Sequence, residues 1–309
     1  MPKKWLPERP AYRPERRRAS YWLLLAFALL FACRLCRDKL GLLADALWLS
    51  LFFEVLACGT PLLFFLTARR GDRRRMLRLR APLPSALLLC ISAFFALLSG
   101  VVLLSLLTGG FATLGPAAAA YATGQKGGFL TRSAAFFVLC LVPAFLEELL
   151  FRGVATAEYE RRGMVRAVVL PTLLFALIHF DVRNLPAYLL WGALSAAVLY
   201  ATESLPSVMV LHACTAGVIL FSHKYMAALY AYTGNVPLLV FLLAMIFLTA
   251  LLFFFRLIAG VYRERDALRL EDPRRAVPMN VQLYTLIDAV TDPMILLCFG
   301  LSIAGFILF

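Results

Sequence analysis

The sequence predicts an all-α, polytopic transmembrane helix bundle of about eight spans, with a short apolar run at the C-terminus that could add a ninth. Of the 309 residues, 62% are hydrophobic and 16% are charged, and the mean hydropathy is +0.82. Such a chain is too apolar for one water-soluble core. The apolar residues form long runs, and the basic residues gather in short clusters between them. Together these three observations are typical of a protein that crosses a membrane several times.

The net charge of +13 does not indicate nucleic-acid binding, because the basic residues lie between apolar runs as they do in cytoplasmic loops. When the runs are threaded alternately from a cytosolic N-terminus, most of the 31 Lys and Arg residues fall on one side. We therefore expect an integral protein of a bacterial plasma membrane with a cytosolic N-terminus. Its expected partners are membrane lipids and a membrane-associated protein or peptide substrate, and no nucleic acid.

The N-terminal part divides into a cytosolic basic arm, 1–19, and a set of transmembrane helices, 20–132. Its first apolar run could instead be the apolar part of a signal peptide, but many spans follow, which favours a retained first span. The Gly- and Ala-rich stretch at the end of this part is typical of a loop or a re-entrant segment. The runs, followed by that stretch, are 21–35, 43–67, 83–108 and 109–128.

The rest of the chain divides into core helices, 133–222, a loop and transmembrane helix, 223–262, and a charged cytosolic stretch with a terminal apolar helix, 263–309. The terminal run has about 16 residues and is barely long enough to span a bilayer. Gly192 and Ala196 give one core helix a small-residue face suited to close packing. The runs of this part are 133–153, 167–180, 185–202, 206–221, 236–258 and 294–309.

Three ionisable side chains stand at the end of the apolar run 133–153, namely Glu147, Glu148 and Arg152. Each charge at membrane depth is expensive, by roughly 3 kcal/mol on insertion scales, and usually faces a polar cavity. Glu148 and Arg152 are four residues apart and can pair on one helix face. Glu147 points about 100° away. It has no local partner, so it could act as a general base or acid. The alternative is that both glutamates simply flank the membrane at its cytosolic surface.

The chain has three histidines, His179, His212 and His223, and the first two lie in apolar runs. A lone histidine in a helix is more often a hydrogen-bonded core residue than a catalyst. Polar groups in otherwise apolar helices tend to find one another, so we expect the two histidines to meet the two glutamates. That contact requires the helix before His179 to be short, tilted or deeply placed. His223 is expected in a solvated loop.

These residues resemble a known pattern. Glu147-Glu148-x-x-x-Arg152, then Phe175-x-x-x-His179, then His212 in a later helix, resembles the three motifs of the CPBP family, the CAAX-protease and bacteriocin-processing intramembrane proteases. The resemblance covers about residues 133 to 221. It implies a glutamate-dependent intramembrane endopeptidase in which Glu147 activates a water with help from His179. Glu148, Arg152 and Phe175 would orient the site, and His212 would stabilise the tetrahedral oxyanion.

The third motif departs from the family pattern, because Ala216 stands where the family has Asn or Asp. Three outcomes are open. Thr215 or Cys214 could supply the missing polar group, the oxyanion site could be weaker, or the chain could be a non-catalytic member. Loss of one oxyanion donor typically lowers the rate on the order of a hundredfold, so activity could survive this departure.

Three other functions compete with a metal-free protease. Glu147, Glu148, His179 and His212 could ligate zinc, although the His-Glu-x-x-His spacing of zinc proteases is absent. On the preferred hypothesis no cofactor is required. A non-catalytic membrane scaffold, immunity or regulatory protein of the same family would use the polar cluster to lock the helices. A transporter would use the glutamates as a proton relay, but the chain shows no inverted repeat.

Overall fold

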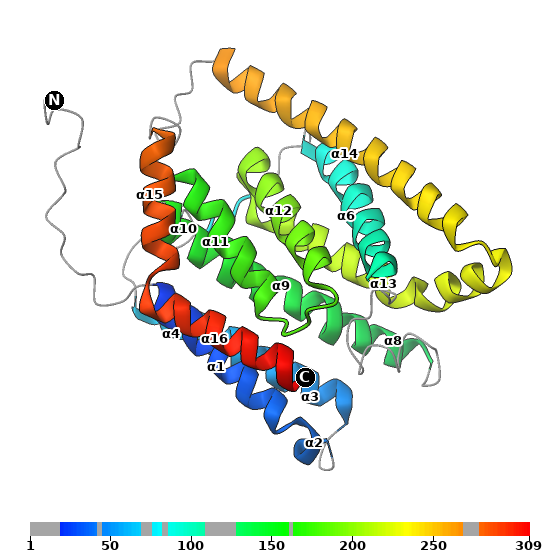
Figure 1. Ribbon diagram of the computed structural model, residues 1–309, viewed down its shortest axis with the longest axis horizontal. Coiled ribbons are helices and arrows are strands. Elements are labelled where there is room, and N and C mark those ends of the chain that lie inside the picture. The colour runs from blue at the N-terminus through cyan, green and yellow to red at the C-terminus, as the bar shows by residue number, and fades with distance from the viewer. Residues whose placement is uncertain are drawn as a thin grey trace, which may run out of the picture.

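The computed structural model confirms the all-α, polytopic bundle, and the residues that it describes contain helices and no strand (Figure 1). Two expected features lie largely outside the described residues: the basic arm and the Gly- and Ala-rich stretch before residue 128. So does most of the charged stretch after Ala267. The described ranges are 19–41, 45–68, 76–81, 86–108, 128–160, 163–267 and 278–309.

Helices of very different length make up the bundle. Three segments within them, η1, η3 and η4, have the wider turns of a π-helix. In chain order the elements are α1 (Ala19–Leu35), α2 (Arg37–Leu40), α3 (Ala46–Glu54), η1 (Val55–Gly59), α4 (Thr60–Ala68), α6 (Leu87–Leu107), α8 (Phe129–Phe136), η3 (Phe137–Leu141), α9 (Val142–Glu148), η4 (Leu149–Ala155), α10 (Thr156–Glu160), α11 (Met164–Leu177), α12 (Leu185–Thr202), α13 (Leu205–Thr233), α14 (Val236–Ala267), α15 (Met279–Val290) and α16 (Pro293–Leu308).

Fewer helices qualify as membrane spans than the sequence predicts. Within the described ranges, six are long and apolar enough to cross a membrane, or seven if the pair α15 and α16, bent by 63°, counts as one span. The expected number of about eight is not confirmed. The difference arises at α1 and α11, which are apolar but shorter than a bilayer requires. In addition, α13 continues to Thr233, through the stretch from residue 223 where we expected a loop.

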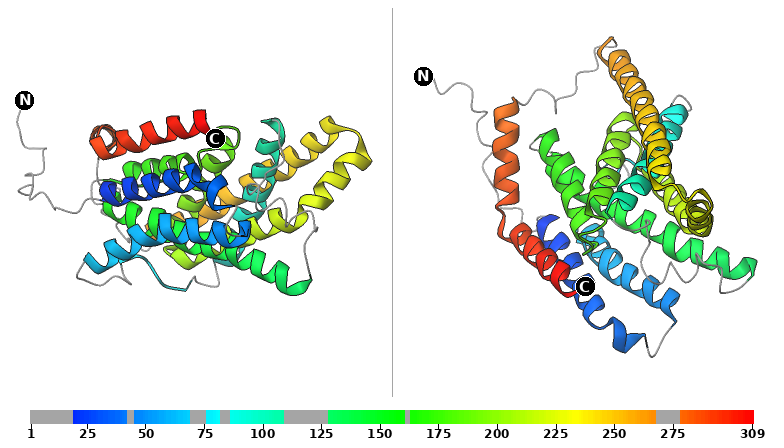
Figure 2. Two further views of the ribbon diagram at one scale, coloured as in Figure 1. Left: turned by 90° about the horizontal axis from the view of Figure 1, so that it is seen from below. Right: turned by 45° about the vertical axis from the view of Figure 1, so that its right-hand side comes forward.

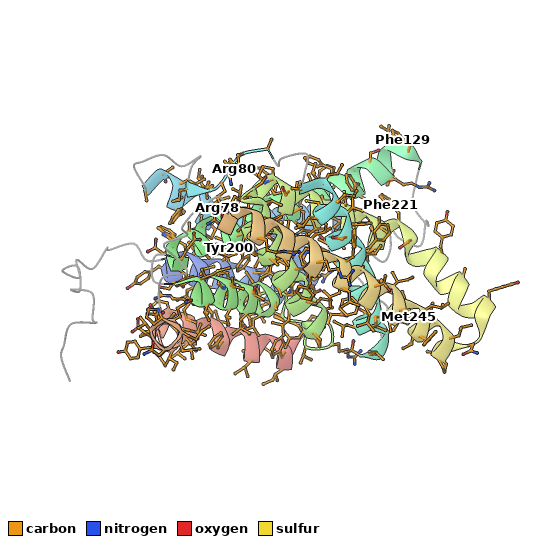
Figure 3. All side chains as sticks on the ribbon, turned by 90° about the horizontal axis from the view of Figure 1, so that it is seen from above. Arg78, Arg80, Phe129, Tyr200, Phe221 and Met245 are labelled. Carbon is orange, nitrogen blue, oxygen red and sulfur yellow. The ribbon has the colours of Figure 1, made fainter. Side chains whose placement is uncertain are left out.

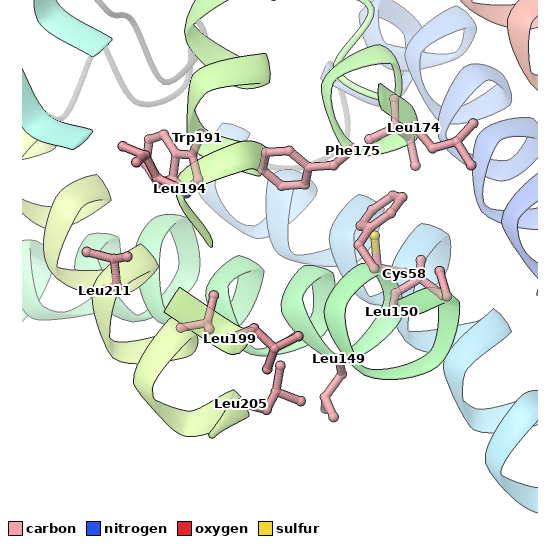
Figure 4. Packing of buried hydrophobic residues seen from close by; sticks show 14 of the residues in the cluster. Cys58, Leu149, Leu150, Leu174, Phe175, Trp191, Leu194, Leu199, Leu205 and Leu211 are labelled. Carbon is pink, nitrogen blue, oxygen red and sulfur yellow. The ribbon is translucent and has the colours of Figure 1, made fainter. Parts of the chain in front are cut away.

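The packing of the bundle places α12 at its centre, in contact with α6, α11 and α13 (Figure 1). On one side α14 lies along α6. On the other side α16 lies along α1, as Figure 1 and the right-hand view of Figure 2 show. A single large cluster of buried apolar side chains runs through the bundle. Cys58, Leu149, Phe175, Trp191 and Leu205 belong to it (Figure 4). Helices that are distant in the sequence therefore share one core.

The short helix α11 brings the second motif to the first. Its 14 residues carry Pro171 and end at Leu177, and α11 packs against η4 and α10. Because the chain turns soon after this short helix, His179 comes within 3.9 Å of Glu147, in the middle part of the long helix Phe129–Glu160. The depth mismatch that a fully crossing helix would create is therefore absent.

A second group of charges, which we call the Arg78 clamp, ties the loop before α6 to the ends of α10 and α12. Arg78 Nη2 donates to both carboxylate oxygens of Glu160 at 2.7 and 2.8 Å, and its Nε lies 3.0 Å from Glu203 Oε2. The guanidinium also lies over the Tyr200 ring, 5.2 Å from its centroid. Figure 3 shows Arg78, Arg80 and Tyr200 close together at one edge of the bundle. The clamp therefore fastens three segments at that edge.

Candidate active site

The first motif lies where an α-helix widens into a π-helix. Glu147 and Glu148 are the last residues of α9, and η4 begins at Leu149. Every residue of η4 is buried, including Arg152. Single π-helical turns inside α-helices are rare and frequently mark functional sites. Thr156, just after η4, is also buried, and its hydroxyl donates to the Phe151 carbonyl at 3.0 Å.

Glu148 is the most deeply buried charged side chain of the site, with 0% of its surface exposed. Its Oε2 lies 3.3 Å from Arg152 Nε, so the pair expected from their spacing is present. Its Oε1 accepts a hydrogen bond of 2.8 Å from Nδ1 of His212 on α13. The carboxylate therefore joins the first and third motifs directly.

Glu147 lies between the two histidines. Its Oε1 is 3.9 Å from His179 Nε2, and its Oε2 is 3.9 Å from His212 Nε2. These separations are too long for direct hydrogen bonds, but a single water molecule can bridge such a gap. Glu147 Oε2 is buried and has no hydrogen-bond partner in the described part of the chain. Each oxygen of Glu147 is thus directed at one imidazole across a gap of about one water.

The tautomer of His179 is fixed by the carbonyl of Phe175, one turn earlier on α11. The Nδ1 of His179 lies 2.7 Å from Phe175 O, and a carbonyl can only accept, so Nδ1 carries the proton. The Nε2 that faces Glu147 is then the basic nitrogen. The ring of Tyr188 on α12 stacks on the imidazole, with centroids 3.9 Å apart and planes 15° apart. His179 is held on one edge and one face.

Phe175 touches all three motifs. Its ring packs edge-on against His179 at 5.0 Å and against His212 at 6.2 Å. The Arg152 guanidinium lies over the same ring, 4.1 Å from its centroid. A cation over an aromatic face is attracted by the ring quadrupole, more strongly where water is excluded. Phe175 is fully buried, so its ring is an apolar surface that contacts Arg152 and both imidazoles.

The third motif supplies only His212 to the cluster. The Thr215 hydroxyl donates to Leu211 O at 2.8 Å, so its proton is used within its own helix, and Cys214 is exposed. Ala216 is buried and offers no polar group. The observed partner of His212 is Glu148. The edge of the Trp191 ring, with its centroid 4.8 Å from that of the imidazole, adds an apolar contact.

Several neighbours of the cluster escaped the prediction from sequence. Tyr188 and Trp191, on α12, contact the two histidines, and Gly192 lets Arg152 approach. A Cβ on Gly192 would lie 3.1 Å from Arg152 Nη2 and 2.9 Å from a methyl of Thr172. The small-residue face expected at Gly192 therefore seats a charged side chain. No sequence pattern links these positions to the motifs, because they meet them only through helix packing.

Glu54 is a third carboxylate near the site, and the sequence did carry a signal for it. It is the last residue of α3, accepts a hydrogen bond from the Cys58 thiol, and interacts electrostatically with Glu147. Its Oε1 is buried without a hydrogen-bond partner in the described ranges. A lone carboxylate in the middle of an apolar run is by itself a functional hypothesis in a membrane protein.

Ligand geometry for a metal ion is not present in the cluster. Among the described residues, no three His, Cys, Asp or Glu side chains are grouped so that they could hold an ion. Nδ1 of His212 is engaged by Glu148, and Nδ1 of His179 by a carbonyl. The Nε2 atoms of both histidines remain directed at Glu147.

Comparison with known proteins supports the resemblance that the motifs indicate. Residues 129–218 match the family model described as Rce1-like, type II CAAX prenyl endopeptidase Rce1-like. The matched segment begins with α8 and ends in α13 beyond His212, so it contains all three motifs. Searches of curated proteins and of solved structures found no significant match to the chain. Over residues 129–218 the chain is thus similar to the Rce1-like family, which belongs to the CPBP group of CAAX-type intramembrane proteases.

Proposed function

We propose that the chain is an intramembrane endopeptidase that hydrolyses a peptide bond of a membrane-associated or lipidated protein or peptide. The observation that carries the proposal is the position of Glu147, whose two oxygens lie 3.9 Å from the Nε2 atoms of His179 and His212. The match to a CAAX prenyl endopeptidase family supports protease activity of this type in its broad form.

The first step in this proposal is activation of a water held between Glu147 and His179. The Glu147 carboxylate accepts one proton of the water, and the water oxygen attacks the carbonyl carbon of the scissile peptide. Since the Nδ1 proton of His179 is donated to Phe175 O, its Nε2 lone pair is free to orient the same water. Burial excludes bulk water, which makes these short-range interactions stronger.

His212 is the proposed donor to the tetrahedral oxyanion. Its Nδ1 proton is donated to Glu148 Oε1, and the role requires a second proton on Nε2. The positive charge of that form is balanced by Glu148, and Arg152 lies against the other oxygen of Glu148. Preorganised donors of this kind in a dry site stabilise developing negative charge without reorganising during the reaction.

The second step breaks the C–N bond. The oxyanion collapses to a carboxylic acid, and the leaving nitrogen takes the proton that Glu147 received from water. Glu147 returns to its carboxylate form, and the new carboxyl group releases its proton to solvent. All protons and bonds are accounted for with one water molecule and the side chains of the cluster.

A prenylated peptide with a CAAX C-terminus is the substrate class that we propose, because the matched family is described as acting on CAAX prenyl substrates. The full chain, purified in detergent or nanodiscs, would be incubated with this peptide and the products identified by mass spectrometry. We expect cleavage by the wild type and a loss of at least about a thousandfold in Glu147→Gln, which removes the general base but keeps the side-chain shape.

The matched control is Glu158→Gln, the same change on α10 of the same long helix, with an expected rate within about twofold of wild type. Wild-type cleavage by Glu147→Gln would refute the proposal. Zinc dependence is tested in the same assay with a chelator. A metal-free mechanism predicts an unchanged rate, whereas loss of activity that added zinc restores would support the zinc hypothesis.

A non-catalytic scaffold or immunity role is the second candidate, favoured by one observation, the apolar and buried Ala216 in the third motif. In that role the hydrogen bond between Glu148 and His212 would lock α9 to α13. Glu147→Ala and His179→Ala separate the two candidates in cells. A phenotype that persists at normal protein levels would support the scaffold, and its loss would support the protease.

A further inference from the structure

The C-terminal pair α15 and α16 lies outside the segment that matches the family, yet it contacts both ends of α11. That helix carries Phe175 and leads directly into His179. We propose that α15 and α16 form a brace that positions His179 for the reaction. The proposal rests on the proposed function, since positioning has a consequence only if His179 acts on a substrate.

The start of α11 is held by Gln282 on α15. Gln282 Oε1 accepts a hydrogen bond of 3.0 Å from the backbone nitrogen of Val165, in the first turn of α11. The first N–H groups of a helix have no partner within it, so an outside acceptor is needed when they are buried. Gly163, just before α11, has a φ of +133°, and its Cα faces the Gln282 side chain closely, with an ideal Cβ 3.1 Å from Cγ. A side chain at position 163 would therefore crowd Gln282 and strain the backbone before α11.

The end of α11 is held by α16 through Phe180, the residue after His179. Phe180 has a φ of +50°, in the left-handed region that bulky residues rarely adopt. Such a conformation persists only where the surroundings impose it. The Phe180 ring is 3% exposed and meets Phe27 and Phe31 of α1, at 6.1 and 5.8 Å, and the terminal Phe309, at 6.1 Å.

Gly305 of α16 lies directly against the Phe180 side chain. A Cβ at Gly305 would lie 2.5 Å from Cδ1 and 3.0 Å from Cβ of Phe180, closer than atoms can stand. Arg34 of α1 completes the enclosure, with its Cζ 5.7 Å from the Phe180 ring centroid and 5.9 Å from that of Phe309. The strained residue is therefore enclosed between α1 and α16, directly after the histidine whose direction it sets.

At the bend between the two helices, Asp292 fixes the brace to the bundle. Its Oδ1 accepts from the Met294 backbone nitrogen at 2.9 Å, and its Oδ2 from the Ser20 hydroxyl of α1 at 3.4 Å. The Asp292 contacts join the brace to α1. The contacts at Gln282 and Phe180 join it to the start and the end of α11. A shift of α16 would accordingly move Phe180 and, with it, the backbone of His179.

The test is Gly305→Ala with Gly300→Ala as its control. Both add one methyl group to α16, but a Cβ at Gly300 meets no atom within 4 Å. With the prenylated CAAX peptide as substrate, we expect Gly305→Ala to lower kcat about tenfold and leave KM within twofold, because small misplacements of a catalytic group slow the chemical step. Gly300→Ala should match the wild type.

Three gentler variants cover the case in which Gly305→Ala does not fold. Phe309→Ala removes a ring from the Phe180 enclosure, Phe309→Tyr keeps it, and Leu308→Ala makes a comparable truncation at a neighbouring exposed position. The brace predicts that kcat per folded molecule falls several-fold in Phe309→Ala alone. His179→Ala is measured in parallel. If His179→Ala keeps wild-type turnover, the proposed function fails.

If His179→Ala is inactive while Gly305→Ala equals Gly300→Ala and Phe309→Ala equals Leu308→Ala, the brace is refuted and the protease stands. A fall in rate that only follows the folded fraction, measured by size-exclusion chromatography, would also refute it, because it would show a purely structural role. A fall in kcat at constant folded fraction, with recovery in Phe309→Tyr, supports the brace.

Discussion

Two ionic clusters in this molecule have similar composition and opposite character. The active-site cluster joins Glu147, Glu148 and Arg152, with the Glu148 and Arg152 side chains 0% and 1% exposed. The Arg78 clamp joins Arg78 to Glu160 and Glu203, with side chains 13 to 17% exposed. In the clamp, the Arg78 side chain meets two carboxylates at 2.7 to 3.0 Å. In the site, Glu147 Oε2 and both terminal nitrogens of Arg152 are buried and make no hydrogen bond within the described residues.

The difference separates a structural use of charge from a chemical one. Buried polar groups are nearly always hydrogen-bonded, so a buried group that is not is an exception that requires an explanation. In the site, each Glu147 oxygen lies 3.9 Å from an imidazole nitrogen, a gap that one water molecule can bridge. In the clamp, Arg78 is paired with two carboxylates and joins three segments of the chain. In the site, buried polar atoms without a partner are available to bind a substrate.

Arg152→Met should give the largest effect of the changes that break this comparison. It would leave Glu148 buried at 0% exposure with the hydrogen bond from His212 and no ion pair to Arg152. Removing one partner of a buried ion pair typically costs about 3–5 kcal/mol of stability, and we expect a rate loss on the order of a hundredfold as His212 loses its fixed direction. Thermal unfolding in detergent and peptide cleavage measure the two effects.

Arg152→Lys is the control for that change, because it keeps the charge and shortens the reach. We expect about half of the stability loss to be recovered, since an ammonium cannot reproduce the guanidinium fork over Phe175. Equal stability of Arg152→Met and wild type would show that Glu148 needs no cation, and the contrast with the clamp would then fail.

Much of the fold could be predicted from the sequence, because apolar runs in a membrane protein determine helices almost directly. The pairing of Glu148 with Arg152 was predictable from a spacing of four residues. The contact of Glu147 with His179 and His212 was only an expectation, since hydropathy does not reveal which helices are neighbours. It depended on whether this helix crosses the membrane fully, which the run 167–180, as short as α11 itself, did not settle.

Features set by packing rather than by composition could not be predicted. Tyr188 stacks on His179 only because α11 and α12 are neighbours. Helix α15 was not expected at all, because its polar residues interrupt the apolar pattern that marks a span. The left-handed backbone of Phe180 has no sequence signal, since glycine and asparagine are the residues that usually mark such a position.

Ala216→Asn tests whether the site lacks a hydrogen-bond donor that the third motif usually supplies. Residue 216 is one turn after His212 on α13, so an added amide would face the same side of the helix. We expect kcat to rise about threefold to tenfold with little change in KM, because the change adds a donor near the oxyanion. Stability should fall by about 1–3 kcal/mol, since Ala216 is buried and the new side chain overpacks the core.

Ala216→Leu, which is of similar size and has no donor, is the control for Ala216→Asn. It should share the loss of stability and show no gain in rate. A rate gain in both variants would attribute the effect to packing, and no gain in either would mean that Glu148 and His212 already complete the oxyanion site.

Arg78→Met should give the smallest effect on rate and therefore tests the other side of the comparison. The clamp is partly exposed and fastens the ends of α10 and α12, so kcat and KM should stay within about twofold of wild type. Stability should fall by about 1–2 kcal/mol, between the values for surface and buried ion pairs, because two carboxylates and the Tyr200 ring lose their cation.

Raising the salt concentration should lower the stability of the wild type and leave that of Arg78→Met less affected, because partly exposed pairs are screened. A tenfold loss of kcat at normal folded yield would show that the clamp also sets the active site, and the division between a structural and a chemical cluster would no longer hold.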